Sequence, residues 1–313
     1  MSDKFNTPVL FLVFNRLDTT KQVFEAIRKA APPRLYVASD GPRDNRDGEK
    51  EKVEEVRDYV LKSIDWDCEV KTLFRKKNLG CGKAVSGAIT WFFENEEMGI
   101  ILEDDCLPVQ SFFQYCEELL EYYKGDERIY HIAGNNPLTF IKSPYSYYFA
   151  RIPHIWGWAT WRRTWNHYSF DIVGLSDFII TKKINGVFNR IIDRVFFIDI
   201  FKKIEKHGID TWDYQWAYTV FNNEGLAIIP TANLITNIGF RSDATHTIKS
   251  DSVYNNQQRF EITKILHTDK IVIDNRIINK INVTAYGLNW LGYSLAKIKN
   301  ALKGINRNVE NNL

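Results

Sequence analysis

The first 105 residues alternate short apolar runs with amphipathic segments, and this alternation constrains the fold more than any other feature of the sequence. Buried parallel strands read as continuous apolar runs, and a helix usually carries the chain from one strand to the next. The pattern predicts an α/β fold with a mostly parallel central sheet, whose ligand would bind beyond the carboxyl ends of the strands. We expect strands at 9–14, 35–39, 70–74 and 99–103, and helices at 18–30, 44–63 and 84–94.

The pattern changes after Asp105, where aromatic residues become frequent. Four of the nine tryptophans lie between Trp156 and Trp165. Helices are expected at 111–123, 187–205 and 212–223, and short strands at 129–133, 146–149 and 226–229. Because no repeat or low-complexity linker interrupts the chain, we expect one compact body with a C-terminal extension.

Composition excludes several classes of protein. Hydrophobic residues make up 44% of the chain and charged residues 26%, the balance of a soluble globular protein. The formal charge of +2 disfavours a nucleic-acid partner bound through bulk charge. Four cysteines without a CxxC pair indicate neither a zinc site nor a disulfide framework. The N-terminus lacks a signal-peptide pattern and no apolar run is long enough to span a membrane, so we expect a cytoplasmic location.

Three consecutive acids, Glu103, Asp104 and Asp105, follow the apolar run 99–102. Adjacent carboxylates repel one another, and a cation or polar ligand beside them would offset that cost. Mn²⁺ and Mg²⁺ prefer oxygen ligands, and because a diphosphate and water can supply most of these, one protein carboxylate would be enough. The alternative interpretation is a helix N-cap with surplus surface acids.

These acids belong to an ordered series of motifs between Thr7 and Thr247. The series is Phe14-Asn15-Arg16, Ser39-Asp40-Gly41, Ile101-Leu102-Glu103-Asp104-Asp105-Cys106-Leu107-Pro108, Gly134-Asn135-Asn136, Ile152-Pro153-His154-Ile155-Trp156-Gly157-Trp158, Thr211-Trp212-Asp213-Tyr214-Gln215-Trp216 and Asn237-Ile238-Gly239. It resembles the nucleotide-sugar-dependent glycosyltransferases of the GT-A fold, in particular the group of the Golgi N-acetylglucosaminyltransferase I and its bacterial relatives. The resemblance implies a Rossmann-like GT-A domain over 1–250, with a nucleotide-binding half (1–105), an aromatic-rich acceptor half (106–250) and a C-terminal helical extension (251–313).

The resemblance also implies roles on the donor side. Asp105 would coordinate the metal, Asp104 would lie near the ribose, and Glu103 would lie near the donor sugar. Asp40 would accept a hydrogen bond from a base N–H, which favours uracil, and Arg16 would line the nucleotide pocket. From the residues alone, Asp40 beside Gly41-Pro42 could equally be a turn residue, and Arg16 could form a surface ion pair.

Inverting glycosyl transfer needs one base to take the proton of the acceptor hydroxyl. In the resembled family the matching Trp-Asp segment carries that base, and here it corresponds to Asp213. Tyr214 and Gln215 stand where the family has its second acid, which leaves Asp213 as the one carboxylate in the segment. The alternative is an aspartate placed at a helix N-terminus because of the helix dipole.

Three further residues are candidates for contacts to ligand. Trp158 could stack on a donor or acceptor sugar, although core packing is the alternative for most of these tryptophans. In the polar segment 241–247, Arg241 could balance diphosphate charge, and His246 could reach the diphosphate or complete the metal shell. A simple hydrogen-bonding role is the alternative for His246.

The C-terminal segment 288–307 carries leucine and isoleucine at spacings of three and four, and its lysines and arginine accumulate late. Such a basic amphipathic helix could contact an anionic membrane surface peripherally, or it could pack on the body or form a homodimer.

We therefore expect a Mn²⁺- or Mg²⁺-dependent inverting glycosyltransferase. It would move a sugar from a UDP-sugar, for example UDP-N-acetylglucosamine, to a hydroxyl of a glycan or lipid-linked saccharide in surface polysaccharide biosynthesis. The alternatives are a sugar nucleotidyltransferase and a non-catalytic sugar-binding module. The nucleotidyltransferase would need a glycine-rich loop after the first strand, and residues 11–17 contain no glycine.

Overall fold

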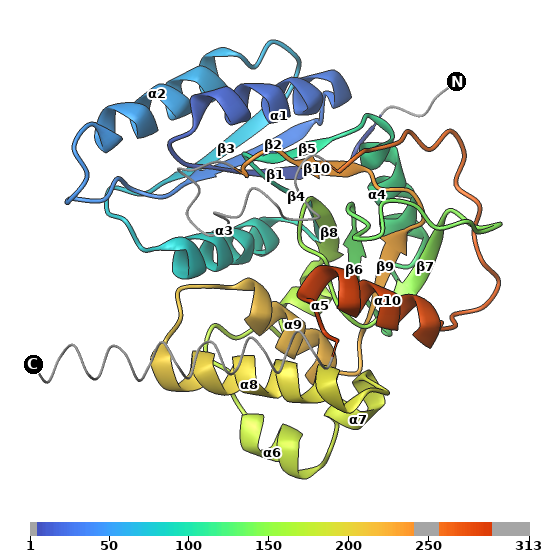
Figure 1. The fold of residues 1–313 in the computed structure, drawn as a ribbon. Coiled ribbons are helices and arrows are strands. Elements are labelled where there is room, and N and C mark those ends of the chain that lie inside the picture. Colours follow the sequence, from blue (N-terminus) through green and yellow to red (C-terminus); the bar gives the residue numbers. More distant parts are fainter. Residues whose placement is uncertain (1–4, 241–256, 290–313) are drawn as a thin grey trace, which may run out of the picture.

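The computed structural model describes residues 5–240 and 257–289, and an eight-stranded sheet forms its centre (Figure 1). The strands are β1 (Val9–Val13), β2 (Arg34–Ser39), β3 (Glu69–Phe74), β4 (Met98–Glu103), β6 (Ile129–Ala133), β7 (Tyr147–Ala150), β8 (Trp158–Trp161) and β9 (Leu226–Pro230). Their order is β3-β2-β1-β4-β8-β6-β9-β7. All except β7 and β8 run in the same direction, which confirms the predicted mostly parallel α/β fold.

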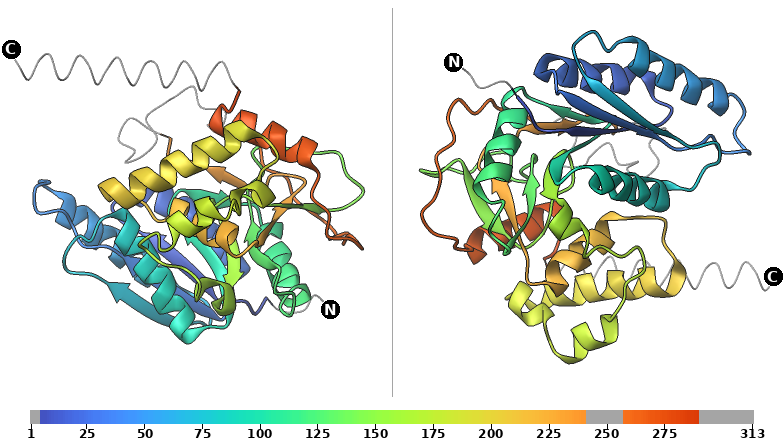
Figure 2. Two further views of the ribbon diagram at one scale, coloured as in Figure 1. Left: turned by 90° about the horizontal axis from the view of Figure 1, so that it is seen from below. Right: turned by 180° about the vertical axis from the view of Figure 1, so that it is seen from behind.

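Helices cover both faces of this sheet, as the views in Figures 1 and 2 show. The side chains of β1 alternate: Phe11 packs in one core with α1 (Leu17–Ala30), α2 (Glu49–Lys62) and α4 (Ser111–Tyr122). Leu10 and Leu12 pack in the other core with α3 (Cys81–Asn95), α8 (Ile191–His207) and α9 (Asp213–Asn222). The period of two in β1 explains why consecutive apolar residues can serve two cores. The remaining helices are α5 (Arg162–Trp165), α6 (Leu175–Ile180), α7 (Ile184–Val187) and α10 (Asn275–Tyr286).

A small second sheet adjoins the end of β4. Strands β5 (Cys106–Pro108) and β10 (Ile235–Asn237) pair antiparallel. Beyond β10, the N–H of Ile238 donates to the carbonyl oxygen of Asp105 at 2.8 Å. The segment that precedes residue 241 is thereby held against the acidic triplet.

The sequence-based expectations differ from the structure at several places. The helix expected over 187–205 begins only at Ile191, because Arg190 is extended (φ −93°, ψ 135°) and separates the short α7 from α8. The helix expected from residue 44 begins only at Glu49. Strand β8 was not predicted, because a four-residue aromatic run shows no clear period.

Trp158 is a correction to the predicted site. Its side chain is 0% exposed, and it stacks on Trp212 with a centroid separation of 5.7 Å and on His131 at 4.9 Å. The alternation of β8 directs this ring into the core, so it cannot stack on a sugar. The aromatic residues that line the large cavity at the carboxyl ends of the strands are Phe14, Trp156, Trp212 and Tyr214.

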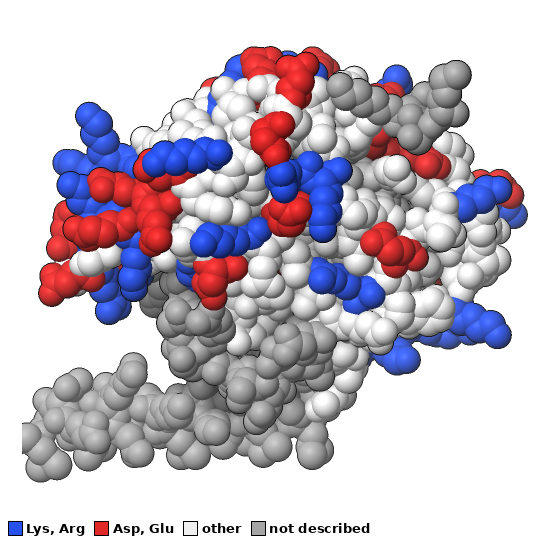
Figure 3. All heavy atoms as spheres, turned by 90° about the horizontal axis from the view of Figure 1, so that it is seen from above, with Lys and Arg blue, Asp and Glu red and all other residues white. Residues whose placement is uncertain are grey.

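The predicted residues Arg241 and His246, and the segment from residue 290 onward, lie outside the described residues. The amphipathic helix over 288–307, with its membrane or dimer contact, therefore stays a prediction. Within 5–240 and 257–289, no helix has the length and apolar character needed to cross a membrane. The described surface shown in Figure 3 carries acidic and basic side chains intermingled, in keeping with the small net charge.

We predict that Trp158→Ala lowers the free energy of unfolding by about 3–5 kcal/mol, because it leaves a large cavity in a packed aromatic core. Trp156→Ala, at a partly buried position lining the ligand cavity, should cost clearly less. Urea unfolding of both variants measures the difference, and equal losses would contradict the core assignment of Trp158.

Candidate active site

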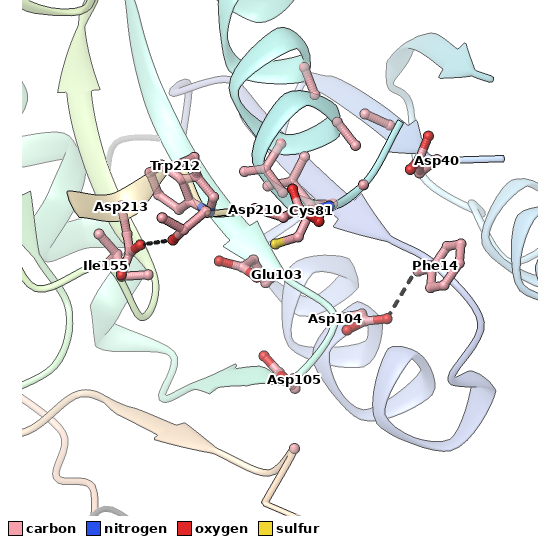
Figure 4. Close-up of a pocket in the computed structure, with 18 of the residues that line it drawn as sticks. Phe14, Asp40, Cys81, Glu103, Asp104, Asp105, Ile155, Asp210, Trp212 and Asp213 are labelled. Carbon is pink, nitrogen blue, oxygen red and sulfur yellow. Dashed lines mark hydrogen bonds between the residues drawn. The ribbon is translucent and has the colours of Figure 1, made fainter. Parts of the chain in front are cut away.

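The acidic triplet lies where β4 leaves the sheet, beside the end of β1. Leu12 is paired in register with Glu103. The backbone N–H of Phe14 donates to Asp104 Oδ2 at 3.3 Å, so the loop after β1 is fastened to the triplet (Figure 4). Both strands are parallel and end at the same edge, which is where open α/β sheets bind ligands.

Arg16 forms ion pairs with two of the three acids. Its Nη2 donates to Asp104 Oδ1, and it lies 3.0 Å from Asp105 Oδ2. Burial alone would lower the pKa of Arg16, but the two neighbouring carboxylates raise it above its ordinary value. Arg16 is thus a fixed cation within the site rather than the surface ion pair that the sequence left open.

One guanidinium does not balance the carboxylates gathered here. Burial raises the pKa of Glu103 well above its ordinary value, and the negative charges of Asp105 and Asp104 raise it further. Burial also raises the pKa of Asp104, although Arg16 opposes that shift. The triplet therefore carries an excess of negative charge that a bound cation would relieve.

A cavity of about 800 Å³ opens over the triplet. Its walls come from the ends of β1, β2 and β4, the N-terminus of α3, the segment 209–214 and the segment 237–239. Six of the predicted site residues line the cavity, namely Arg16, Asp40, Glu103, Asp104, Asp105 and Asp213. Figure 4 shows Glu103 and Asp105 on the segment where β4 ends, and Asp213 on a separate segment of the chain.

Asp40 acts as a turn residue that also faces the cavity. Its carboxylate accepts the N–H of Gly41 at 2.9 Å and the N–H of Leu79 at 2.9 Å. It thereby joins the end of β2 to the loop that precedes α3. Burial raises its pKa, and these backbone hydrogen bonds oppose the shift. The turn role is confirmed, and contact with a base N–H stays a prediction.

Asp213 begins α9 on the opposite side of the cavity from Asp40. The hydroxyl of Thr211 donates to Asp213 Oδ1, so one carboxylate oxygen is oriented by its own loop. The same segment carries Trp212, which is buried on the core side. Asp213 is partly buried and lines the cavity, which leaves its carboxylate accessible to a ligand there.

Two cavity residues were missed by sequence reasoning. Asp210 accepts the backbone N–H groups of Cys81 at 3.0 Å and of Gly82 at 2.7 Å, which satisfies donors at the start of α3. Gly80 precedes α3 with φ +80°. Nothing in the local sequence indicated that an aspartate 128 residues after Gly82 accepts hydrogen bonds from the start of this helix. Arg75 also lines the cavity, and burial lowers its pKa.

The donor set suits a hard cation but does not form a complete metal cage. Within 5–240 and 257–289, no group of three or more His, Cys, Asp or Glu side chains is arranged to hold a metal ion. Asp105 offers a carboxylate at the cavity, and the surrounding excess of negative charge fits Mn²⁺ or Mg²⁺. Further ligands would have to come from a bound diphosphate, from water or from residues outside the described ranges.

Comparisons with known proteins show a likeness of fold alone. No family model matches the sequence, and no curated protein matches it. Similar solved structures include the mannosyltransferase PcManGT from Pyrobaculum calidifontis in complex with GDP-Man and Mn²⁺ (TM-score 0.36, 15% identity, covering 54% of this chain and 49% of that one). They also include S. aureus TarS 1-349 (TM-score 0.41, 10% identity, 74% and 59%) and apo UDP-glucose pyrophosphorylase (TM-score 0.35, 8% identity, 74% and 93%).

The match spans about half of the mannosyltransferase and less than two thirds of TarS. Similarity at this level assigns neither a family nor a reaction. None of these names links the chain to the N-acetylglucosaminyltransferase I group, so that finer resemblance stays a prediction from the sequence motifs.

Proposed function

We propose that this protein is an inverting glycosyltransferase that moves a sugar from a UDP-sugar to a hydroxyl of an acceptor saccharide. One observation carries the proposal: a single cavity at the carboxyl ends of the strands joins the acidic triplet to Asp213. The triplet supplies carboxylates that would bind a divalent cation, and that cation would bind the diphosphate of the donor. Asp213 supplies a separate carboxylate for proton transfer.

The reaction would proceed by one displacement. The acceptor oxygen attacks the anomeric carbon of the donor, and its proton passes to the free oxygen of Asp213. The bond between the anomeric carbon and the diphosphate oxygen breaks on the opposite face, and the nucleoside diphosphate leaves. The hydrogen bond from Thr211 orients the Asp213 carboxylate for this step.

The leaving diphosphate carries negative charge that the site must stabilise. Asp105 would hold Mn²⁺ or Mg²⁺, and the bound ion would neutralise charge that develops on the diphosphate. Arg16 keeps Asp104 and Asp105 in fixed positions, and Arg75 adds a second guanidinium to the cavity wall. These side chains bind and orient the donor in the proposed reaction.

Asp210 would act as a positioning residue for Asp213. It caps the start of α3, which belongs to the donor half, and it lies three residues before the proposed base. The start of α3 can approach the loop before α9 this closely because position 82 is glycine. A Cβ there would lie 2.7 Å from the Thr211 carbonyl oxygen. The base is thereby held at a fixed place relative to the donor half.

The arrangement of the loop after β1 disfavours the nucleotidyltransferase alternative. That reaction would need a glycine-rich loop with a basic side chain directed at a triphosphate. Here the loop has no glycine, and its Arg16 is engaged with Asp104 and Asp105.

The first prediction concerns donor binding. UDP with Mn²⁺ should stabilise the protein by about 2.7 kcal/mol at a concentration near 100 times Kd. Asp105→Ala should abolish the part of this stabilisation that depends on Mn²⁺, whereas Asp213→Asn should retain it. Thermal unfolding with UDP, with Mn²⁺ and with both provides the measurement. If UDP with Mn²⁺ left the melting temperature of the wild type unchanged, the proposed donor site would be wrong.

The second prediction concerns the base. Asp213→Asn should reduce transfer by about 10²- to 10⁴-fold, because it removes the proton acceptor while preserving the shape of the side chain. The control is Asp171→Asn, at an exposed position outside the cavity, which should transfer normally. Release of UDP from a panel of UDP-sugars in the presence of acceptor saccharides measures the rate. Normal transfer by Asp213→Asn would show that another group is the base.

The third prediction concerns Asp210. Asp210→Ala should lower the free energy of unfolding by about 0.5–2 kcal/mol, as loss of a helix N-cap does. The substitution should also lower kcat, because Asp213, the proposed base, would lose its fixed position. The Kd for UDP should change little, because Asp213 is not proposed to bind UDP. Urea unfolding and transfer assays test the two effects. A variant of unchanged stability would mean that the contact with α3 contributes nothing.

A further inference from the structure

A second, smaller cavity adjoins the first at the proposed base. Its volume is about 270 Å³, and Ile155, Trp156, Asp213 and Tyr214 line both cavities. Asp213 therefore lies at the boundary between them. Because ligand pockets for drug-sized molecules run from ~300 to 1,000 Å³, the smaller cavity suits a single ring.

Two of the residues that line this cavity each carry a buried polar atom without a hydrogen-bond partner among the described residues. The two atoms are Asn135 Oδ1 and His154 Nε2, on side chains that are 3% and 7% exposed. A buried polar atom without a partner costs free energy, so a protein that keeps two of them beside one cavity has a reason to do so. A ligand that hydrogen bonds to both would supply that reason.

The segment that carries His154 is held in place from behind. His131 Nε2 lies 2.9 Å from the His154 carbonyl oxygen and must donate to it, because a carbonyl can only accept. His131 Nδ1 is then the acceptor for the indole N–H of Trp216 at 3.2 Å. This chain of hydrogen bonds fixes the backbone of His154, and the side-chain Nε2 of His154 takes no part in it.

The wall of the smaller cavity selects against charged ligands. None of the described residues that line it is lysine or arginine, and the carboxylate of Asp213 repels anions. Burial lowers the pKa of His154 to about 4, so its imidazole is neutral at neutral pH. Trp156 and Tyr286 contribute aromatic side chains to the wall, and sugar rings pack on aromatic faces.

A hydroxyl group matches the two unpartnered atoms. Asn135 Oδ1 can only accept a hydrogen bond, and a neutral imidazole nitrogen either donates or accepts. Hydroxyls do both, whereas an ionised carboxylate or phosphate cannot donate to Asn135 Oδ1. The chemistry of the wall thus specifies an uncharged, hydroxyl-bearing ring.

We propose that this cavity is the acceptor subsite and that it takes a neutral pyranose ring whose hydroxyls bond to Asn135 and His154. The inference rests on the proposed function in that Asp213 would deprotonate another hydroxyl of the same ring. Tyr286 of α10 closes the subsite, and its ring is held 5.6 Å from that of Phe197 in α8. Helix α10 would thereby form part of the acceptor subsite.

The test uses methyl pyranosides as probes with the full chain. Binding of methyl glucoside, galactoside, mannoside and N-acetylglucosaminide is measured by ligand-observed NMR in the presence of UDP and Mn²⁺, with methyl glucuronide as the anionic counterpart. At least one neutral glycoside should bind the wild type, and the glucuronide should bind at least tenfold more weakly. His154→Phe and Asn135→Leu should each weaken the neutral glycoside about tenfold, with UDP binding unchanged.

Thermal unfolding separates a binding role from a structural one. Because each substitution removes an unpartnered polar atom, both variants should melt at or above the wild-type temperature. Matched controls are His207→Phe and Asn166→Leu, at exposed positions outside the cavity, which should bind the glycoside normally. If no neutral glycoside binds, or if both variants bind it as the wild type does, the subsite is wrong while the donor site stands. Failure of UDP and Mn²⁺ to bind would instead overturn the proposed function.

Discussion

The contact of Arg16 with Asp104 and Asp105 is the interaction on which the site depends. It links the loop after β1 to the end of β4 and so sets the floor of the larger cavity. A single guanidinium leaves the acidic triplet short of positive charge. Burial raises the pKa of Glu103, and the neighbouring charges of Asp105 and Asp104 raise it further. Stability and ligand binding therefore oppose one another here: the charge that makes the empty site costly is the charge that would attract a cation and its diphosphate.

Much of the fold could be predicted because its signals are local. In β1 and β6 five consecutive buried residues form a strand, and the expected bounds agree to within one residue. The acidic triplet could be placed at the end of a strand for the same reason, since an apolar run that stops at charged residues marks the edge of a sheet. The prediction that Glu103, Asp104 and Asp105 lie together at a ligand-binding edge of the sheet needed no knowledge of tertiary contacts.

The rest depends on contacts between distant segments. Strand β8 is recognisable only once β4 and β6 lie on either side of it, and Trp158 is then buried, whereas Trp156, which precedes the strand, reaches the cavity. Asp210 was missed because its partners lie on α3, far away in the sequence. Asn135 and His154 stood in motifs that the sequence singled out, but only the folded chain shows that both line one cavity.

The helix α9 and the loop before it connect all the parts of the proposed site. Asp210 fastens the loop to the start of α3, and Asp213 faces both cavities at the first turn of the helix. One turn later, Trp216 bonds to His131, which in turn holds the backbone of His154. Because a helical turn is rigid, the proposed donor side, the proposed base and the proposed acceptor side cannot shift independently of one another. The ten residues of α9 thus help to fix the spacing between the two cavities. In the proposed reaction, that spacing would determine whether an acceptor hydroxyl in the smaller cavity can reach a donor in the larger one.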